Sequence, residues 1–408
     1  MSKLRPFRAL RPQPEKAALV SAVPYDVVST SEAAELSRGN PLSFLHLSRP
    51  EKDLPPGTDP YSDAVYGRAR TEFDRIRREA PLVREAEPSI YLYRLRMGSH
   101  VQTGIAASYS IDEYDAGTIR KHERTRQDKE DDRTRHVRTL SAQTGPVFLA
   151  YRGRDAINAE VTKLCASTAP LFDFTAPDGV AHTLWKVSDR TVLERLTAEF
   201  ARVPMLYIAD GHHRAASASR VHRELGPSGA PDADRDHFLA VAFPMEQLRI
   251  LPYHRVLKDL NGRTPEQLLE QLARDFELAP DAGADAPHGE FRMYLGGRWY
   301  GLAPRTRPDP SDPIAALDVS VLQERVLTPI FGIRDPRTDK RIDFVGGIRG
   351  TAELQAWVDS GRAAVAFSMH PTSMEELLRV ADANGIMPPK STWFEPKLRD
   401  GLLTHTFE

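Results

Sequence analysis

The chain has 408 residues, of which 40% are hydrophobic and 27% charged, and its formal net charge is −2. This length allows two domains, or one large elaborated domain, with a real core. The near-neutral charge argues against a general nucleic-acid binder, which usually carries a basic excess. The single cysteine, Cys165, excludes a disulfide framework and a multi-thiolate zinc site within one chain, and packing is its expected role.

The N-terminus is not expected to be a signal peptide. Residues 1–6 lack the apolar stretch of a signal peptide. No window approaches the roughly 18 apolar residues that a membrane helix needs. We therefore expect a cytoplasmic protein without a membrane partner.

The first hundred residues are expected to contribute the walls of a pocket. Pro24 and the valines at 27–28 favour an extended segment around Asp26. Asp26 is either a site residue or a turn residue that bonds its own backbone. Ser29 or the threonine after it should cap a short helix over 31–36.

A buried strand is predicted over 44–47, because Phe, Leu and Leu dominate it. It should end at Arg49 and Glu51, and charged residues at a strand end are typical of a pocket wall in an α/β protein. An amphipathic helix over 64–76 and a hairpin over 87–109 are expected to follow.

Residues 119–138 form the most strongly charged stretch, with thirteen charged residues and two histidines in twenty. A helix that is polar all round normally bridges solvent and carries ion pairs between residues four apart. The pairs expected here join Arg126 to Glu130 and Asp131 to Arg135. The stretch is thus either a solvated helix or the face of a site.

The second interpretation depends on where particular side chains fall. Arg133 and His136 lie on one helical face, together with a lysine and an aspartate. Lys121, His122 and Glu123 come where the preceding strand should end. This arrangement would direct a carboxylate and a set of cations toward one site.

A second cluster follows the apolar strand predicted over 203–208. The strand ends in an Asp-Gly turn that runs into an Ala/Ser-rich helix over 215–225. Such a geometry presents backbone N–H groups and a positive helix end to an anion. The cluster is Asp210, Gly211, His212, His213 and Arg214. The cluster is either a solvated loop with a capping aspartate or a phosphate or metal site. A phosphate or metal site would explain why groups that are costly to bury are gathered there.

The C-terminal part should contain a smaller inserted module, beginning near Thr264 and closed by a Pro/Asp-rich linker over 303–313. Near the end, Lys390, Ser391 and Thr392 follow two prolines and fit neither a helix interior nor a central strand. They would suit phosphate or carboxylate contacts. The alternative is an arm that packs the aromatic pair at 393–394 on another surface.

Further elements are predicted from the hydrophobic pattern. The predicted helices cover 156–165, 191–200, 264–276, 317–327, 353–360 and 373–383. The predicted strands cover 145–151, 238–243, 248–257, 291–295, 299–302, 343–347 and 363–369, with a hairpin over 171–187.

Several segments together resemble the domain-of-unknown-function 1015 family, nearly from end to end. The matching pieces are residues 23–29, 40–41, 49–51, 121–125, 129–133, 145–147, 209–214 and 387–396. The Asp-Gly-His-His-Arg and Pro-Pro-Lys-Ser-Thr blocks are the most specific. The family name itself implies no activity.

A second resemblance, to the ParB/sulfiredoxin superfamily core, does imply an activity. It rests on Ile119-x-x-His122-Glu123 before a helix and on the Asp-Gly-His-His-Arg turn at the head of another. Some members of that superfamily are free L-serine kinases. The resemblance implies that Glu123 is the catalytic base and that the turn holds the phosphates of a nucleotide.

The resemblances imply an α/β fold of mixed α+β character. A ParB/sulfiredoxin-like nucleotide-binding core is expected within a larger mixed-sheet domain that carries the inserted module. The expected regions are an N-terminal α/β region over 1–110, the core over 111–260 and a C-terminal α/β region over 261–408.

The activity expected from this reasoning is transfer of a phosphoryl group from ATP or ADP, with Mg²⁺, to a small hydroxy compound, L-serine being the best single choice. The expected catalytic residues are Glu123, His212 and Asp210. The expected phosphate-binding residues are Gly211, His213, Arg214, Lys121, His122, Arg133 and His136. The expected substrate-binding residues are Asp26, Arg49, Glu51, Lys390, Ser391 and Thr392.

Two alternatives from other classes stay open. One is a metal-dependent hydrolase with Asp210, His212, His213 and His122 as ligands, since His and Asp suit Zn or Mn. The other is a nucleotide-operated ParB-type switch, although no DNA-reading helix is recognisable. The expected partners are a nucleotide and a small molecule rather than nucleic acid, with a homodimer as one option for assembly.

Overall fold

The computed structural model describes residues 2–80, 82–226 and 233–407 of the chain. These residues form two compact units. Unit 1 comprises residues 1–248 and 396–408, and unit 2 comprises residues 249–395. The C-terminal segment therefore returns to the first unit after the second is complete.

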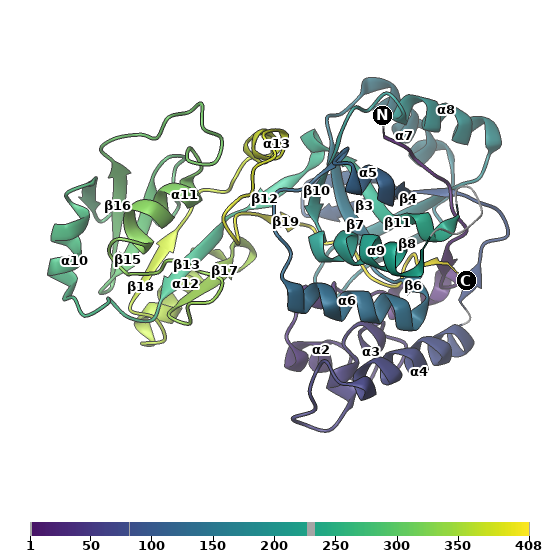
Figure 1. Cartoon of the computed structure of the whole chain (residues 1–408), viewed down its shortest axis with the longest axis horizontal. Coiled ribbons are helices and arrows are strands. Elements are labelled where there is room, and N and C mark those ends of the chain that lie inside the picture. The colour runs from purple at the N-terminus through teal and green to yellow at the C-terminus, as the bar shows by residue number, and fades with distance from the viewer. Residues whose placement is uncertain (1, 81, 227–232, 408) are drawn as a thin grey trace. The chain divides into compact units, whose positions relative to one another are not determined.

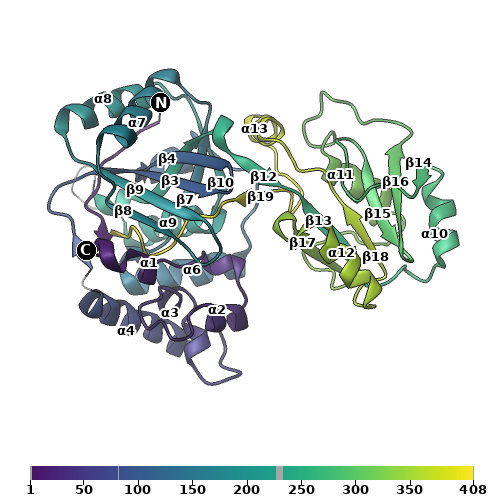
Figure 2. The same ribbon diagram turned by 180° about the vertical axis from the view of Figure 1, so that it is seen from behind.

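Unit 1 is built around one mixed eight-stranded sheet (Figure 1). Two neighbouring pairs are parallel, β5 with β10 and β7 with β11, and the other pairs are antiparallel. In spatial order the strands are β5 (Ile119–Arg120), β10 (Leu206–Asp210), β7 (Val147–Tyr151), β11 (His237–Pro244), β4 (His100–Ser110), β3 (Ile90–Met97), β9 (Ala181–Val187) and β8 (Phe172–Thr175). Figure 2 shows the β4–β3–β9–β8 side of this sheet.

Helices and short strand pairs complete unit 1. Helix α6 packs between α9 and α4, and α7 lies beside α8. The helices are α1 (Ala17–Val20), α2 (Thr30–Leu36), α3 (Leu45–Ser48), α4 (Asp63–Glu79), α5 (Ile111–Asp115), α6 (Gln127–Leu140), α7 (Asp155–Ser167), α8 (Arg190–Phe200) and α9 (His212–Leu225). The short pairs are β1 (Leu10–Arg11) with β2 (Val83–Arg84), and β6 (Ala142–Gln143) with β20 (His405–Thr406).

Two apolar clusters hold unit 1 together. One lies between the sheet and α5, α7, α8 and α9, with Ile105, Leu149 and Ile208 fully buried within it. The other joins the N-terminal helices to α6 through Phe44 and Phe73. Burial of large apolar side chains is the dominant favourable term in folding, so these clusters position the ends of β5, β10 and α9.

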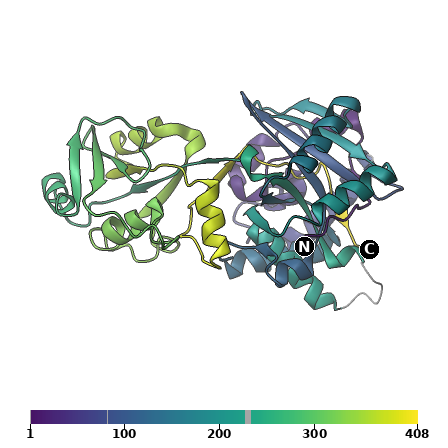
Figure 3. The same ribbon diagram turned by 90° about the horizontal axis from the view of Figure 1, so that it is seen from above.

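Unit 2 has its own six-stranded sheet, and all of its pairings are antiparallel. In Figure 3, helices lie on both sides of this sheet. In spatial order the strands are β14 (Phe276–Pro280), β16 (Arg298–Pro304), β15 (Phe291–Leu295), β18 (Val365–Ser368), β13 (Tyr253–Leu257) and β17 (Ile342–Gly346). A separate pair joins β12 (Arg249–Leu251) to β19 (Trp393–Glu395). The helices are α10 (Pro265–Leu272), α11 (Asp318–Leu322), α12 (Gly350–Asp359) and α13 (Met374–Asp382).

The mixed α/β class and most of the long elements agree with the sequence predictions. The hairpin over 87–109 is the β3–β4 pair, with Met97 opposite His100. The hairpin over 171–187 is the β8–β9 pair. Ser29 forms the expected cap of α2, in a reciprocal hydrogen-bond pair with Glu32. Local signals of this kind act within a few residues, so the chain sequence suffices to predict them.

Two strand predictions in the N-terminal region are wrong. Residues 25–27 form a single 3-10 turn, and residues 45–48 form the short helix α3. A short apolar run does not by itself distinguish a strand from a buried helical turn. Here Phe44 and Leu47 are buried against the N-terminal helices rather than against a sheet, so tertiary packing selects the helical turn.

The compact units also divide the chain differently from the three expected regions. The hairpin β3–β4 lies in the same sheet as β7, β10 and β11, so residues before and after position 110 share one unit. The inserted module is larger than expected, because it begins at Arg249 rather than near Thr264 and ends at Glu395. None of the helices in the described residues is long and apolar enough to cross a membrane.

The boundaries of unit 2 generate a prediction. Arg249 and Glu395 are opposite each other in an antiparallel pair, so the two points of insertion are about 5 Å apart. Each unit has its own apolar core. We therefore expect a chain in which a short Gly/Ser linker joins residue 248 to residue 396 to remain folded. Circular dichroism should show a cooperative thermal transition, and a gradual non-cooperative melt would contradict the assignment.

Candidate functional site

The site is organised around the turn between β10 and α9. Asp210 ends the strand, Gly211 has a φ of 92°, and the helix begins at His212. This backbone conformation favours glycine because a Cβ atom is strained there. The carboxylate of Asp210 accepts a hydrogen bond from the Gly211 N–H at 2.8 Å, which holds the turn closed. The turn therefore aims the N-terminus of a fourteen-residue helix at the edge of the sheet.

The Lys-His-Glu segment reaches the same edge because β5 runs parallel to β10. Ile119 is opposite Leu206 and Arg120 is opposite Tyr207, so the three residues after β5 lead to the level of Asp210, where β10 ends. Glu123 Oε2 lies 3.9 Å from His212 Nδ1. The rings of His122 and His212 are perpendicular, with their centroids 4.5 Å apart. The two motifs, distant in the chain, thus form one site.

The imidazoles of this site are neutral at pH 7. Burial lowers the pKa of His212 well below its usual value, and the neighbouring His122 contributes to the shift. Burial also lowers the pKa of His122 to about 4 and lowers that of His213. His213 Nε2 accepts a hydrogen bond from the Arg126 N–H at 3.0 Å. Such rings can donate or accept hydrogen bonds to a ligand, but they do not supply positive charge.

Positive charge comes instead from Arg214 and Lys397. Lys397 Nζ lies 2.9 Å from Asp210 Oδ2. Burial alone would raise the pKa of Asp210, but the charges of Lys397 and Arg214 outweigh it and keep that pKa well below its usual range. Arg214 donates to the Pro146 carbonyl at 2.6 Å and lies 3.3 Å from Asp26. Asp210 is therefore ionised, with both of its oxygens engaged.

Lys397 was not among the residues expected from the sequence. The expected Lys390 lies in unit 2, where its ammonium group is 5.2 Å from the centre of the Tyr253 ring. Ser391 donates to the Pro388 carbonyl at 2.6 Å, and Thr392 is half-buried beside it. The aromatic residues at 393–394 belong to β19, which pairs with β12. This agrees with the alternative in which the arm packs these aromatic side chains on another surface.

Helix α6 proves to be a packed helix rather than a solvated one. Arg126 pairs with Asp128 instead of Glu130, and the expected pair of Asp131 with Arg135 is replaced by pairs to the neighbouring helices, because α6 lies between them. Arg135 pairs with Asp63 of α4, and Asp131 pairs with Arg220 of α9. A tertiary partner that is fixed in place competes effectively with a flexible partner one turn away.

The face of α6 that was singled out in the sequence is buried. Arg133 pairs with Asp132 at 2.8 Å, and its guanidinium lies 4.1 Å from the centre of the Tyr25 ring. His136 donates to the Leu47 carbonyl at 3.1 Å, and burial lowers its pKa to about 4. Both side chains face a cavity rather than solvent.

Arg49 and Glu51 do not line the cavity, but they fix the backbone of a segment that does. They pair with each other at 2.8 Å, and Arg49 also donates to the Tyr25 carbonyl at 3.2 Å. They thereby hold the backbone of the turn that carries Asp26. Lys121 has a different environment, since its ammonium lies 3.7 Å from the centre of the Tyr114 ring and burial lowers its pKa.

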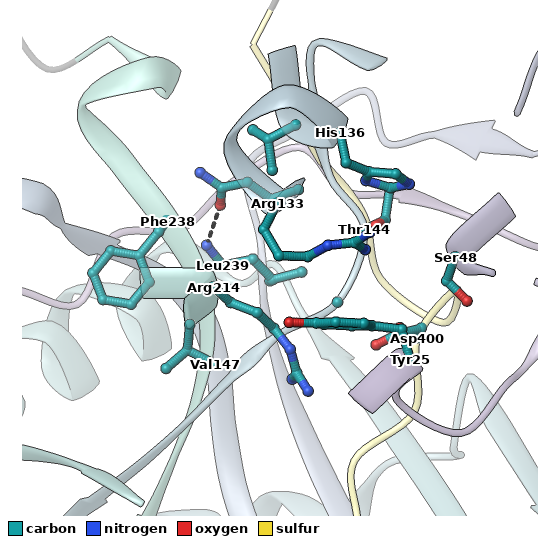
Figure 4. Close-up of a pocket in the computed structure, with 13 residues that line it drawn as sticks. Tyr25, Ser48, Arg133, His136, Thr144, Val147, Arg214, Phe238, Leu239 and Asp400 are labelled. Atoms are coloured by element: carbon teal, nitrogen blue, oxygen red, sulfur yellow. Dashed lines mark hydrogen bonds between the residues drawn. The ribbon is translucent and has the colours of Figure 1, made fainter. Parts of the chain in front are cut away.

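The cavity in unit 1 begins at Arg214 and extends toward α6 (Figure 4). In the close-up, the Tyr25 ring is seen edge-on between the side chains of Arg133 and Arg214. Val147, Phe238 and Leu239 form an apolar wall. The polar lining is Tyr25, Ser48, Arg133, His136, Gln143, Thr144, Arg214 and Asp400. No motif in the sequence had pointed to Asp400.

The hydrolase alternative requires a group of metal ligands. Within residues 2–80, 82–226 and 233–407, no group of three or more His, Cys, Asp or Glu side chains is placed to hold a metal ion. Asp210 is paired with Lys397, and His213 accepts a backbone hydrogen bond. Asp210 and His213 thus have other partners, and among the described residues no third ligand joins His122 and His212.

A family model described as "Protein of unknown function (DUF1015)" matches residues 4–320. The chain belongs to this family. The match covers the whole of the Asp-Gly-His-His-Arg turn and the Lys-His-Glu segment, and it extends into unit 2. No curated protein matches the DUF1015 chain.

Solved structures give weak matches to this DUF1015 protein. A free serine kinase mutant in complex with AMP is 15% identical, with a TM-score of 0.38 over 74% of this chain and 92% of that one. A conserved hypothetical protein from Pyrococcus furiosus is 16% identical, with a TM-score of 0.37 over 74% and 94%. SbnI from Staphylococcus aureus is 13% identical, with a TM-score of 0.38 over 72% and 85%. Likenesses of this strength carry no argument about activity.

The turn generates a prediction about Gly211. Replacing Gly211 by Ala should cost about 1–2 kcal/mol of folding free energy, because a residue with a Cβ is strained at this φ. Gly117→Ala is the matched control, with a φ of 79° and open space around its Cβ position. Urea denaturation should show similar losses for both variants, since the added Cβ of Gly211→Ala makes only ordinary contacts. An unchanged Gly211→Ala midpoint would contradict the assigned backbone conformation.

The Asp210–Lys397 pair generates a second prediction. Lys397→Met should cost about 3 kcal/mol at pH 8, because it leaves a mostly buried carboxylate without its partner. The pair stabilises the fold above the pKa of Asp210 in the unfolded chain, about 4, and this stabilisation is lost as the pH falls. The deficit should therefore shrink in urea titrations below pH 4.

Two controls accompany this variant. Lys390→Met changes a lysine that only contacts an aromatic ring, so it should cost less than about 1 kcal/mol. Asp210→Asn combined with Lys397→Met should restore part of the loss, because both charges are then removed together. Equal losses for the single and double variants would show that Lys397 acts through some other contact.

Proposed function

We propose that this protein transfers a phosphoryl group from a nucleotide, ATP or ADP, to a hydroxyl group of a small acceptor, with L-serine as the first candidate. The observation that carries the proposal is the 3.9 Å between Glu123 and His212 at the N-terminus of α9. A carboxylate beside an anion-binding helix end is the minimum that phosphoryl transfer requires of a protein.

The phosphate-holding part of the site would be the turn itself. The first N–H groups of a helix have no partners within the helix, so those of His212 and His213 point out of the end of α9. His212 Nε2 is buried and has no hydrogen-bond partner among the described residues. Arg214 and Lys397 lie beside these donors, each paired with a carboxylate. The donor set therefore suits a phosphate better than it suits a transition metal.

Glu123 would be the proton acceptor. Its side chain is 43% exposed, so an acceptor molecule can reach it. The acceptor oxygen would form a bond to the transferred phosphorus while the bond from that phosphorus to the nucleotide oxygen breaks. The hydroxyl proton would pass to the Glu123 carboxylate. His212, as a neutral ring, would orient the carboxylate without neutralising it.

The residues also fit a nucleotide bound with Mg²⁺. Mg²⁺ would offset the negative charge of the phosphates, and it usually takes few ligands from the protein itself. Asp210 has both oxygens engaged, so its role would be to hold Lys397 and the turn in place. Glu123 is the carboxylate of the two motifs that is most open to solvent.

A direct assay tests the proposal. The purified protein would be incubated with Mg-ATP or Mg-ADP and L-serine, and phosphoserine would be measured by mass spectrometry. Formation of phosphoserine, or of another phosphorylated hydroxy compound, is the expected result. Absence of transfer to every member of a panel of amino, hydroxy and polyhydroxy compounds, with both nucleotides, would reject it.

A substitution of the proton acceptor gives a sharper prediction. Glu123→Gln should lower kcat by at least about a hundredfold, the usual contribution of a general base, while nucleotide binding measured by calorimetry stays unchanged. Glu194→Gln on α8 is the matched control, because Glu194 only forms an exposed pair with Arg190. A Glu123→Gln enzyme with wild-type kcat would show that another group accepts the proton.

A further inference from the structure

The cavity lined by Arg133 and Arg214 is not a simple anion-binding site. Arg133 is paired with Asp132, and Arg214 with Asp26. The Tyr25 ring lies between the two guanidinium groups, 4.1 Å from one and 5.9 Å from the other. Each guanidinium therefore already has a carboxylate at its edge and a ring at its face. Their charges are offset before any ligand enters.

Asp400 is the carboxyl group in this cavity that has an oxygen without a hydrogen-bond partner among the described residues; Ser48 Oγ and Arg214 Nε are also buried without one. Asp400 is 2% exposed, and its Oδ1 is the oxygen without a partner. The charged groups that face it are Arg214, Asp26, Arg133 and Arg399. The first three belong to the pairs described above, and Arg399 pairs with Asp178. The cluster thus contains one carboxyl group more than its cations offset.

The position of Asp400 is rigidly determined. Its backbone exchanges two hydrogen bonds with Ala22, at 2.9 and 3.1 Å. Arg399 donates to His182 Nε2 at 3.0 Å, and Tyr93 lies 2.8 Å from the other nitrogen of that ring. The carboxyl group packs so closely on Gly145 that a side chain there would overlap it. Asp400 therefore lines the cavity in a fixed position, with its unpartnered Oδ1 packed against Gly145.

These charges restrict the ligand. A buried carboxyl oxygen without a partner is costly, and a hydrogen-bond donor of the ligand would remove that cost. Once Asp400 is ionised, an anion would bring a further negative charge next to it, and a simple cation would lie close to two guanidinium groups. A molecule without net charge avoids both penalties if it offers a hydroxyl or ammonium donor.

We propose that this cavity is the recognition subsite for the acceptor and that Asp400 is its specificity-determining residue. The acceptor is then a small molecule without net charge, such as a zwitterion or a polyol, which donates a hydrogen bond to Asp400. The acceptor role rests on the proposed phosphotransferase function. The subsite itself selects against anionic hydroxy acids of the same size.

Calorimetry on the full-length protein without nucleotide tests the subsite. L-serine and glycerol carry no net charge, whereas D-glycerate has the same three-carbon skeleton and one negative charge. L-serine or glycerol should bind at least about tenfold more tightly than D-glycerate. Asp400→Asn should weaken the binding of the neutral ligand about tenfold, and Asp400→Leu about a hundredfold. Asp189→Asn, which changes only the cap of α8, should leave binding unchanged.

The outcomes separate this proposal from the proposed function. Binding that depends on Asp400, without any phosphorylation, supports the subsite and rejects the kinase. Phosphorylation with the same KM in wild type and Asp400→Asn supports the kinase and rejects the subsite. Equal affinity for D-glycerate and L-serine, or no binding of either neutral compound, also rejects the subsite.

The stability of Asp400→Asn checks that the variant folds and that Asp400 is buried as described. Burial, with Asp26 adding to it, raises the pKa of Asp400 to about 7. An acid whose pKa is higher in the folded protein than in the unfolded chain loses stability as the pH rises between the two values. The variant should therefore match the wild type near pH 4 and have the higher melting temperature at pH 8. A lower melting temperature at pH 8 would contradict this environment.

Discussion

The parallel pairing of β5 with β10 is the constraint on which the site depends. Parallel neighbours end at the same edge of a sheet, so the segments that follow them must start side by side. Glu123 follows one strand and His212 follows the other. Their proximity is therefore a property of the sheet rather than of either loop. The glycine conformation at 211 completes it by directing α9 away from that edge.

The second organising feature is the pairing of buried charged side chains near the edge of the sheet. Each arginine that lines the cavity has a carboxylate partner, and Lys397 has Asp210. The imidazoles remain neutral because burial lowers their pKa values. Buried charges are tolerated when they are paired, whereas an unpaired buried charge is costly. Asp400 departs from this pattern, because it has no cation of its own and its Oδ1 has no hydrogen-bond partner among the described residues.

The short N-terminal segments show where sequence patterns were insufficient. The capping box at Ser29 was predictable because its hydrogen bonds span three residues. The apolar run at 44–47 was not, because its helical turn is selected by contacts with residues far along the chain. Likewise, Arg135 and Asp131 of α6 pair with residues of α4 and α9 instead of with each other. Charge patterns alone do not contain the positions of those partners.

The sequence by itself determined the two charged motifs, the glycine turn between strand and helix, and most of the long helices and hairpins. These features depend on residues close together in the chain, where propensity, capping and turn geometry act. Only the tertiary structure decided that Glu123 meets His212, that Lys397 rather than Lys390 pairs with Asp210, and that Asp400 faces the cavity. Each of these relations joins elements far apart in the chain, and their contacts follow from strand order and from the return of the C-terminal segment to unit 1.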